Sequence, residues 1–322
     1  MKVTLQPSGA VLDVEAGEAI LDAARRLGYT CPQSCRNGNC HVCAALLVEG
    51  RVRQNGAEMD HGELYTCIAE PLQDCVLHWD GVLLPGELPV RSLGCQVVDC
   101  IEVGGDVWRV LLRAPAGKPP RYHAGQYLLI ERLDGEQSAF SLASAPQQGR
   151  DLELHILGRE ASALNLLQQL REQGTARVQL PFGDAHLAEL PDGPLVLIAA
   201  GTGMAQMHSL IEECRSRGFQ HPVHLYWGAR RPEDFYQLPH WDEWQALPNL
   251  SLHQVVSDQC GWQGRCGLLH EAVREDFADL STLHVYASGS PSMVYATLDA
   301  LVEAGMDAHQ MRADVFAYAP RD

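Results

Sequence analysis

The stretch Ser34-Cys35-Arg36-Asn37-Gly38-Asn39-Cys40-His41-Val42-Cys43 (residues 34–43) places three cysteines within nine positions. Gaps of four residues and then two are typical of the loop that holds a [2Fe–2S] cluster, and such a loop needs one more cysteine further on. Soft thiolates are the ligands that suit iron–sulfur clusters. Gly38, with Asn37 and Asn39, predicts the positive φ angles that let a backbone wrap a cluster. We therefore predict a metal-binding loop.

Two later cysteines, Cys67 and Cys75, compete to be the fourth ligand. We predict Cys67, because Cys75 begins an alternating strand pattern that is typical of a buried side chain. Cys31, four residues before the loop, is interpreted in the same way as a small buried hydrophobe. Zinc is the alternative for the whole set. Zinc sites favour two short cysteine knuckles, however, and no second knuckle follows in this sequence.

The composition narrows the function classes. The 322 residues include 11 cysteines, carry a formal charge of −17 and are 46% hydrophobic. The absence of an apolar leader and the cysteine usage predict a cytoplasmic protein with metal or redox chemistry. The negative charge argues against nucleic-acid binding, and the longest apolar runs are too short to span a membrane. The first 90 residues hold 12 Asp/Glu against 6 Lys/Arg, which is either a solvated surface or one that docks a basic partner.

Three segments follow from the pattern of apolar residues and turns. Residues 1–85 predict a hairpin, a helix over 18–27, the cysteine loop and a linker rich in Pro and Gly. Residues 90–188 contain six short strands and one helix, over 162–173, which predicts a small antiparallel β-barrel. Residues 193–322 alternate strands with helices and end in a strand over 311–316. This predicts a doubly wound parallel α/β domain, and the fold class is multi-domain, β and α/β.

With Cys67 as the fourth cysteine, residues 34–43 resemble the loop of the plant-type ferredoxin domain. The resemblance implies a β-grasp fold for residues 1–85 and a [2Fe–2S] cluster on Cys35, Cys40, Cys43 and Cys67. His41 departs from this family, which usually has a small residue after the second cysteine. It either adjusts the potential of the cluster or faces solvent.

Residues 90–322 resemble the ferredoxin–NADP⁺ reductase superfamily. Residues 122–127 (YHAGQY) are similar to its Gly-Gln-Tyr turn, and residues 138–143 (SAFSLA) to its flavin motif. The resemblance implies that residues 90–188 bind FAD, with Phe140 packed on the flavin ring, Ser141 bonded near N5 and Leu142 beside them. Ser162 opens the predicted helix and is either part of a second phosphate site or an ordinary helix cap.

Ser138 stands where this superfamily has an arginine against the flavin pyrophosphate. Losing a cation that pairs with a diphosphate should weaken binding. Three alternatives stay open at this point. Arg132 or Arg159 replaces the missing cation, the flavin is FMN, or the flavin binds loosely.

The third segment has the pattern of a nicotinamide-binding domain. Residues 195–200 form an apolar strand that leads into Gly201-Thr202-Gly203, and a strand, glycine loop and helix suit a dinucleotide pyrophosphate. The loop resembles the superfamily's Gly-Thr-Gly, although Gln206 replaces the usual proline. Ser288-Gly289 resembles the start of the Cys-Gly-Pro-Pro motif that closes over the nicotinamide, with Ser288 in place of the thiol. Phe316 resembles the final aromatic that stacks on the flavin. The resemblance thus implies catalytic roles for Ser141, Ser288 and Phe316.

The preference between NADH and NADPH is open in the sequence. Arg230 and Arg231 are candidates to hold a 2′-phosphate, whereas Glu233 or Asp234 would suit a free ribose hydroxyl. The expectation is NADH.

The order of the motifs predicts an NAD(P)H-dependent reductase. Electrons would pass from NAD(P)H to the flavin, then singly to the cluster and on to a separate acceptor protein. The chain most resembles reductases of two systems, the CDP-6-deoxy-3,4-glucoseen reductase type and those of multicomponent oxygenases. The resemblance implies an iron–sulfur dehydrase or an oxygenase as the acceptor, and a monomeric reductase. The alternatives are a free flavin reductase, which uses flavin as a substrate, and a non-catalytic redox-sensing module.

Overall fold

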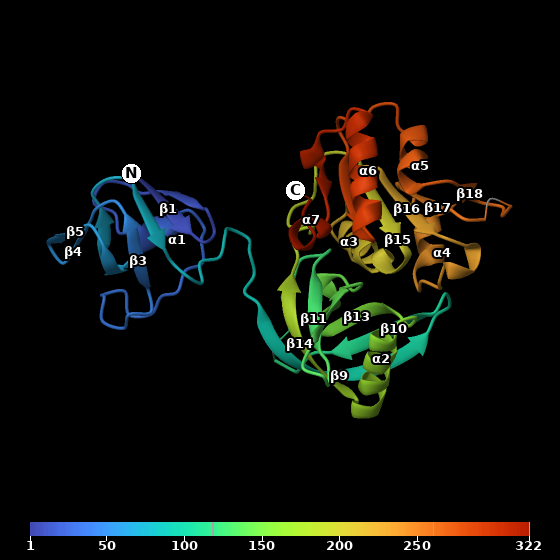
Figure 1. The fold of residues 1–322 in the computed structure, drawn as a ribbon, viewed down its shortest axis with the longest axis horizontal. Coiled ribbons are helices and arrows are strands. Elements are labelled where there is room, and N and C mark those ends of the chain that lie inside the picture. Colours follow the sequence, from blue (N-terminus) through green and yellow to red (C-terminus); the bar gives the residue numbers. More distant parts are fainter. Residues whose placement is uncertain (118, 260, 322) are drawn as a thin grey trace. The chain divides into compact units, whose positions relative to one another are not determined.

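The computed structural model describes residues 1–117, 119–259 and 261–321. The chain divides into two compact units, Met1–Pro89 and Val90–Asp322, which are taken separately below (Figure 1). Within the described ranges, no helix combines the length and the apolar character that a membrane span requires.

The first unit is a small sheet protein with one helix. Its elements are β1 (Lys2–Gln6), β2 (Val11–Asp13), α1 (Ile20–Arg26), β3 (Ala44–Glu49), β4 (Val52–Gln54), β5 (Ala57–Met59), β6 (Gly62–Tyr65), β7 (Ala69–Pro71) and β8 (Cys75–His78). The main sheet has the order β2-β1-β8-β3-β6, and β5-β4-β7 form a second, smaller sheet. Strand β1 is antiparallel to β2 and parallel to β8, so the first and last strands are neighbours at the sheet centre. This is the predicted β-grasp arrangement.

Helix α1 packs its apolar side against the core of the first unit. Ile20, Leu21, Ala23 and Ala24 are fully buried, and Leu27 is partly buried against the same core. The helix begins two residues later than expected, after Ala19 in extended conformation. The backbone N–H of Leu21 donates to the carbonyl of Thr66 at 2.9 Å. This bond ties the helix to the segment that carries Cys67.

The second unit begins with the predicted antiparallel barrel. Its elements are β9 (Arg91–Glu102), β10 (Val107–Arg113), β11 (Tyr127–Glu131), β12 (Gln137–Ser141), β13 (Asp151–Leu157), α2 (Ala161–Gln173) and β14 (Thr175–Phe182). The strand order is β12-β11-β14-β9-β10-β13. The two edge strands approach each other where the N–H of Ala143 donates to the carbonyl of Glu153 at 2.8 Å. The six strands therefore come close to closing around the buried apolar side chains.

The α/β part of the second unit carries a six-stranded parallel sheet. Its elements are β15 (Leu195–Ala200), α3 (Met204–Ser216), β16 (Val223–Ala229), α4 (Trp241–Gln245), β17 (Leu250–Val256), β18 (Arg265–Cys266), α5 (Leu269–Asp276), β19 (His284–Ser288), α6 (Pro291–Glu303), β20 (Met311–Arg312) and α7 (Val315–Tyr318). The order β18-β17-β16-β15-β19-β20 reverses direction beside β15. Residues 195–199 are fully buried because helices cover both faces of the sheet, as the continuous apolar run predicts. In open sheets of this kind, ligands bind at the carboxyl ends of the strands near the reversal.

The last predicted strand, over 311–316, is wrong in its second half. Strand β20 pairs with β19 through Met311 and Arg312 only, and Phe316 lies on helix α7. The chain leaves the sheet because Asp314 turns its carboxylate toward the barrel, where it accepts the N–H of Ala185 at 3.0 Å.

Candidate functional site

The cysteine loop of the first unit has no regular secondary structure, and its path is set by unusual backbone angles. Positive φ angles occur at Arg36, Gly38 and His41, and not at the two asparagines that the sequence suggested. Asn37 acts through its side chain instead, since its Oδ1 accepts the N–H of Asn39 at 3.2 Å. Gly38 has a φ of +80°, and a Cβ atom there would lie 2.6 Å from Cδ1 of Ile68, so a larger residue would be strained and would force the Ile68 side chain to move.

The four predicted ligands are arranged as two pairs. The N–H of Cys35 points to Sγ of Cys40 at 3.4 Å, and the N–H of Cys40 points back to Sγ of Cys35 at 3.3 Å. The sulfurs of Cys43 and Cys67 lie 3.2 Å apart. Among the residues that the structure describes, no three His, Cys, Asp or Glu side chains gather as they would around a single ion. Two cysteine pairs, with three of the four cysteines on one loop and Cys67 after β6, suit a two-iron cluster better than one zinc ion.

The electrostatics of the two pairs differ. Cys35 is exposed, and N–H groups of the loop, first that of Asn37, lower its pKa to about 6. Burial raises the pKa of Cys67 to about 11. A buried thiolate at Cys67 therefore needs a nearby positive charge, which bound iron would supply. The donor set and its surroundings fit a [2Fe–2S] cluster.

The other two cysteines of this unit lie apart from the pairs. Cys75 is buried, and its Sγ contacts the carbonyls of Gln73 at 3.1 Å and Arg51 at 3.4 Å. Cys31 is also buried, and burial raises its pKa to about 11. His41 is exposed and stacks on Tyr65 with 4.4 Å between ring centroids. The stack stands next to Cys40 in the chain and forms part of the surface around the loop.

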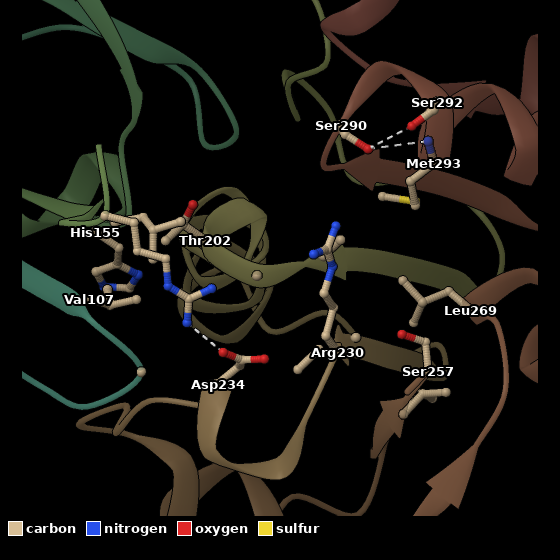
Figure 2. Close-up of a pocket in the computed structure, with 18 of the residues that line it drawn as sticks. Val107, His155, Thr202, Arg230, Asp234, Ser257, Leu269, Ser290, Ser292 and Met293 are labelled. Atoms are coloured by element: carbon tan, nitrogen blue, oxygen red, sulfur yellow. Dashed lines mark hydrogen bonds and ion pairs between the residues drawn. The ribbon is translucent and has the colours of Figure 1, made fainter. Parts of the chain in front are cut away.

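The second unit contains a cavity of about 1030 Å³ between the barrel and the carboxyl edge of the parallel sheet. Figure 2 shows side chains from the barrel, such as His155, facing those that follow β15, β16 and β17. The cavity is large enough for a dinucleotide or for a flavin with part of a nicotinamide nucleotide. It lies where ligands of doubly wound sheets bind.

The four predicted flavin residues do not all lie at the cavity. Phe140 lines the cavity, together with Ala139 of the same strand. Ser141 is partly buried at the end of β12, and Leu142 is fully buried in the barrel core. Ser162 is exposed in the first turn of α2. None of the last three is among the residues that line the cavity.

The predicted nicotinamide residues form one side of the cavity. Gly201 and Thr202 line it directly. At Gly203 a Cβ atom would lie 2.3 Å from the carbonyl oxygen of Ser288, and Gly289 packs as tightly against the side chain of Met293. These glycines let the β15 and β19 loops approach each other. Phe316 lies outside the lining residues and packs near Tyr295, at 5.6 Å between ring centroids.

The residues around Ser138 determine whether a positively charged side chain is available to bind a flavin diphosphate. Arg132 is the near one, with Nη1 3.5 Å from the Ser138 hydroxyl, and it also pairs with Asp134. Arg159 lines the cavity, but its guanidinium is held by the carboxylates of Asp106 and Asp234. The ring portion of a flavin therefore fits against Phe140, whereas the described residues offer the phosphate portion Arg132, which is itself paired with an acid.

Two groups that the sequence reasoning missed join the barrel to the sheet. Gln206 is buried, and its side-chain amide donates to the carbonyls of Gly125 at 2.8 Å and Ala185 at 3.0 Å and to Asp314 at 3.2 Å. The sequence did show a glutamine in place of the usual proline. It could not show the hydrogen-bond partners of Gln206, because they are far away in sequence. His155, also missed, lines the cavity and bonds Glu153 at 3.1 Å and the Tyr236 hydroxyl at 2.9 Å.

Comparisons with known proteins identify two protein families in the chain. Residues 3–72 match the 2Fe-2S iron-sulfur cluster binding domain, and residues 197–299 match the oxidoreductase NAD-binding domain.

Three similar proteins cover almost the whole chain. Terephthalate 1,2-dioxygenase, reductase component 1, of Comamonas sp is 30% identical over 99% of this chain and 98% of its own. The CDP-6-deoxy-L-threo-D-glycero-4-hexulose-3-dehydrase reductase of Yersinia pseudotuberculosis is also 30% identical, over 98% of both chains. Among solved structures, the Amycolatopsis cytochrome P450 reductase GcoB matches with a TM-score of 0.69 and 27% identity over 98% of both chains.

Proposed function

The chain belongs to the ferredoxin–NADP⁺ reductase superfamily, among members with a [2Fe–2S] domain on the same chain, and from this we propose how its two units divide the work. It is an NAD(P)H-dependent oxidoreductase whose cofactors are a [2Fe–2S] cluster, FAD and a nicotinamide dinucleotide. The proposed path runs from NAD(P)H through FAD and the cluster to a separate acceptor protein. One observation carries it: a single chain holds both the paired cysteines and a cavity that is lined by Phe140 and by the Gly201–Thr202 loop.

The bound flavin converts an electron pair from the nicotinamide into the single electrons that the cluster accepts. The chain supplies binding and orientation. Phe140 offers an apolar face for the flavin ring, with Ser141 next in the strand, and Gly201 and Thr202 leave room for a pyrophosphate at the start of α3. Ser288, held against Gly203, would orient the nicotinamide. Phe316, on α7, is proposed to close the flavin site.

The proposed acceptor is an oxygenase component or an iron–sulfur dehydrase. The two curated relatives serve a dioxygenase and a hexulose dehydrase by name, which supports either choice. The first unit is acidic, with twelve Asp/Glu against six Lys/Arg in residues 1–89, so the acceptor would present a basic surface. Because both sites are built from one chain, we propose a monomer. Cluster thiols must stay reduced until iron arrives, which favours the cytoplasm.

Anaerobic mixing of the purified holoenzyme with NADH or NADPH tests the path. The flavin absorbance should bleach first and the cluster absorbance afterwards, because the flavin stands between donor and cluster. Phe140→Ala should slow the first phase at least several-fold, while the Cys67→Ser variant should show the first phase without the second. The proposed path is wrong if neither dinucleotide bleaches either chromophore, or if the cluster is reduced in a flavin-free preparation.

A free flavin reductase is the second candidate. The observation that favours it is the shortage of cations for a flavin phosphate, with Ser138 at the motif and Arg159 committed to two acids. Such an enzyme would lose its flavin on a desalting column, yet would reduce added FMN with saturation. Flavin that stays bound, and rates that do not depend on added FMN, would exclude this candidate.

A further inference from the structure

We propose that Trp227 is a positioning residue for the donor dinucleotide. Its indole N–H holds the carbonyl of Gly201 from behind the Gly201–Thr202 loop. The loop then turns N–H groups, rather than this carbonyl oxygen, toward the pyrophosphate. The inference rests on the proposed function, because it concerns the loop that is proposed to bind the donor. Trp227 acts through the loop and does not itself touch the donor.

Trp227 lies beside the loop because of the register of two parallel strands. Strand β16 runs next to β15, where Trp227 pairs with Ala199 and Gly228 pairs with Ala200. Gly201 follows directly, so the end of β15 brings the loop within reach of the Trp227 side chain. The indole Nε1–H donates to the carbonyl oxygen of Gly201 at 3.1 Å. A buried indole N–H needs a hydrogen-bond partner, and here the backbone of the loop supplies it.

The carbonyl of Gly201 accepts from two donors. The backbone N–H of Met204, at the start of α3, also donates to it, in a bond shared with the carbonyl of Thr202. A carbonyl oxygen has two lone pairs, so the two donors together fix its direction. Gly201 has a φ of +54°, and a Cβ atom there would meet nothing within 4 Å. Glycine is therefore needed at this position for the turn of the backbone and not for space.

The indole lies on the side of the loop away from the cavity. Gly201 and Thr202 line the cavity, whereas Trp227 is 2% exposed and is not one of the lining residues. A carbonyl oxygen carries a partial negative charge and repels a pyrophosphate, while backbone N–H groups at the start of a helix attract it. A donor behind the loop therefore keeps the carbonyl turned away from the place where the anion would bind.

Other aromatic side chains hold the indole in place. The Trp227 ring packs edge-on against Phe235, at 4.8 Å between ring centroids, and against Tyr236, at 5.0 Å. Trp241 packs on it at 5.6 Å. The Tyr236 hydroxyl bonds Nδ1 of His155, on barrel strand β13, at 2.9 Å. The indole, and with it the loop, is therefore held relative to the barrel as well as to its own sheet.

Trp227→Phe tests the inference, because it keeps an aromatic ring in place and removes the N–H. The probes are ADP-ribose, which contains the whole pyrophosphate, and AMP, which has one of its phosphates; their 2′-phosphorylated forms replace them if NADPH is the donor. In calorimetric titrations of the holoenzyme, the variant should bind ADP-ribose about threefold to tenfold more weakly, the range expected for one hydrogen bond. AMP affinity should change less. KM for the donor should rise by a similar factor, with kcat nearly unchanged.

Trp244→Phe is the matched control. Trp244 is fully buried, and its indole N–H donates to Oε1 of Glu212 at 2.8 Å instead of to the loop. This variant should lose a comparable amount of thermal stability but keep the ratio of the ADP-ribose and AMP affinities. In ¹H–¹⁵N spectra, the indole signal that Trp227→Phe removes should shift when ADP-ribose binds, and the signal that Trp244→Phe removes should not.

Three outcomes overturn the inference. One is a Trp227→Phe variant with the wild-type ratio of the two affinities, and another is an equal change in Trp244→Phe, since the effect would then be a general loosening of the domain. The third is a Trp227 indole signal that ADP-ribose leaves unmoved. If Trp227→Phe fails to fold, this signal, assigned in the wild type through its contacts with Phe235 and Tyr236, still decides. An unmoved signal in protein whose flavin the donor bleaches refutes only this inference, whereas bleaching by neither dinucleotide refutes the proposed function.

Discussion

At the scale of single residues, Cys67 and Cys75 are two buried thiols eight positions apart with different surroundings. Sγ of Cys67 lies 3.2 Å from Sγ of Cys43, whereas Sγ of Cys75 contacts two backbone carbonyls. Carbonyl oxygens repel a thiolate, so Cys75 is suited to stay a thiol. The pairing of sulfurs makes Cys67 the better ligand.

Cys67→Ser should therefore lose most of its [2Fe–2S] content, because an oxygen ligand replaces a soft sulfur in a cluster that needs four thiolates. Cys75→Ala should keep the cluster at a cost of about 1 kcal/mol or less in stability. Iron and acid-labile sulfide per protein, with the visible absorbance, measure both. The reverse pattern would make Cys75 the fourth ligand.

Asp314 gives the second unit a dependence on pH that can be measured. Burial, its largest influence, raises the pKa of Asp314 above its ordinary value of 3.8. The folded state then holds this proton more tightly than the unfolded state. The resulting stability is fully present below about pH 3.8 and is lost as pH rises through the folded-state pKa.

In urea titrations, the free energy of unfolding of the wild type should thus fall relative to Asp314→Asn as the pH is raised from about 4 to about 7. The comparison concerns the slope with pH, because Asn also changes the bond to Gln206. Parallel pH profiles for the two proteins would show that the carboxyl is ionised throughout.

At the scale of elements, the shape of the cysteine loop depends on Gly38. Gly56 has the same φ angle and serves as the matched control. Gly38 and Gly56 both have a φ of +80°, but a Cβ at Gly38 would lie 2.6 Å from Ile68 and one at Gly56 would meet nothing within 4 Å. Gly56→Ala carries only the conformational cost, about 1–2 kcal/mol. Gly38→Ala adds a steric cost of about 1–3 kcal/mol.

We expect Gly56→Ala to keep its cluster with a modest loss of thermal stability, and Gly38→Ala to lose cluster because the loop must move. Iron content and thermal melts of both variants check this. Equal iron content in the two would mean that Ile68 yields without disturbing the loop.

Most elements could be predicted because their signals are local. The apolar run and the short barrel strands fix burial from adjacent residues, and the strand over 195–200 was placed without error. Two features depend on distant partners and were missed. The turn at Asp314 is set by Ala185, 129 positions away, and the positive φ angles at Arg36 and His41 come from how the loop closes.

In the candidate site, too, features with a local sequence signal were predicted and features that depend on distant partners were missed. Cys35, Cys40 and Cys43 and the Gly201–Thr202 loop are contiguous motifs and were predicted from sequence, whereas Cys67 had to be chosen over Cys75. His155 and the ion pairs of Arg159 come from segments that only the fold brings together.

At the scale of the whole molecule, the net negative charge of the first unit affects which acceptor proteins it attracts. Residues 1–89 hold twelve Asp/Glu against six Lys/Arg, around a loop whose Cys35 and Cys40 are exposed. A unit with this net negative charge attracts basic acceptors and repels anionic ones, and salt screens both effects.

Raising the salt from about 0.01 M to about 0.5 M should therefore lower kcat/KM for cytochrome c, a basic protein, by several-fold or more. The rate with ferricyanide, a small anion, should hold or rise. Steady-state assays with one enzyme preparation give both values. A fall of equal size for both acceptors would point to weakened donor binding rather than to the surface of the first unit.

The division of the chain at Pro89 and Val90 also has a kinetic meaning. A covalent connection holds a second site at an effective concentration of the order of millimolar, whatever the concentration of the protein. Transfer between flavin and cluster then follows first-order kinetics and does not slow when the enzyme is scarce. Only the final encounter with the acceptor depends on abundance, so a cell could adjust the flow of electrons through the amount of acceptor alone.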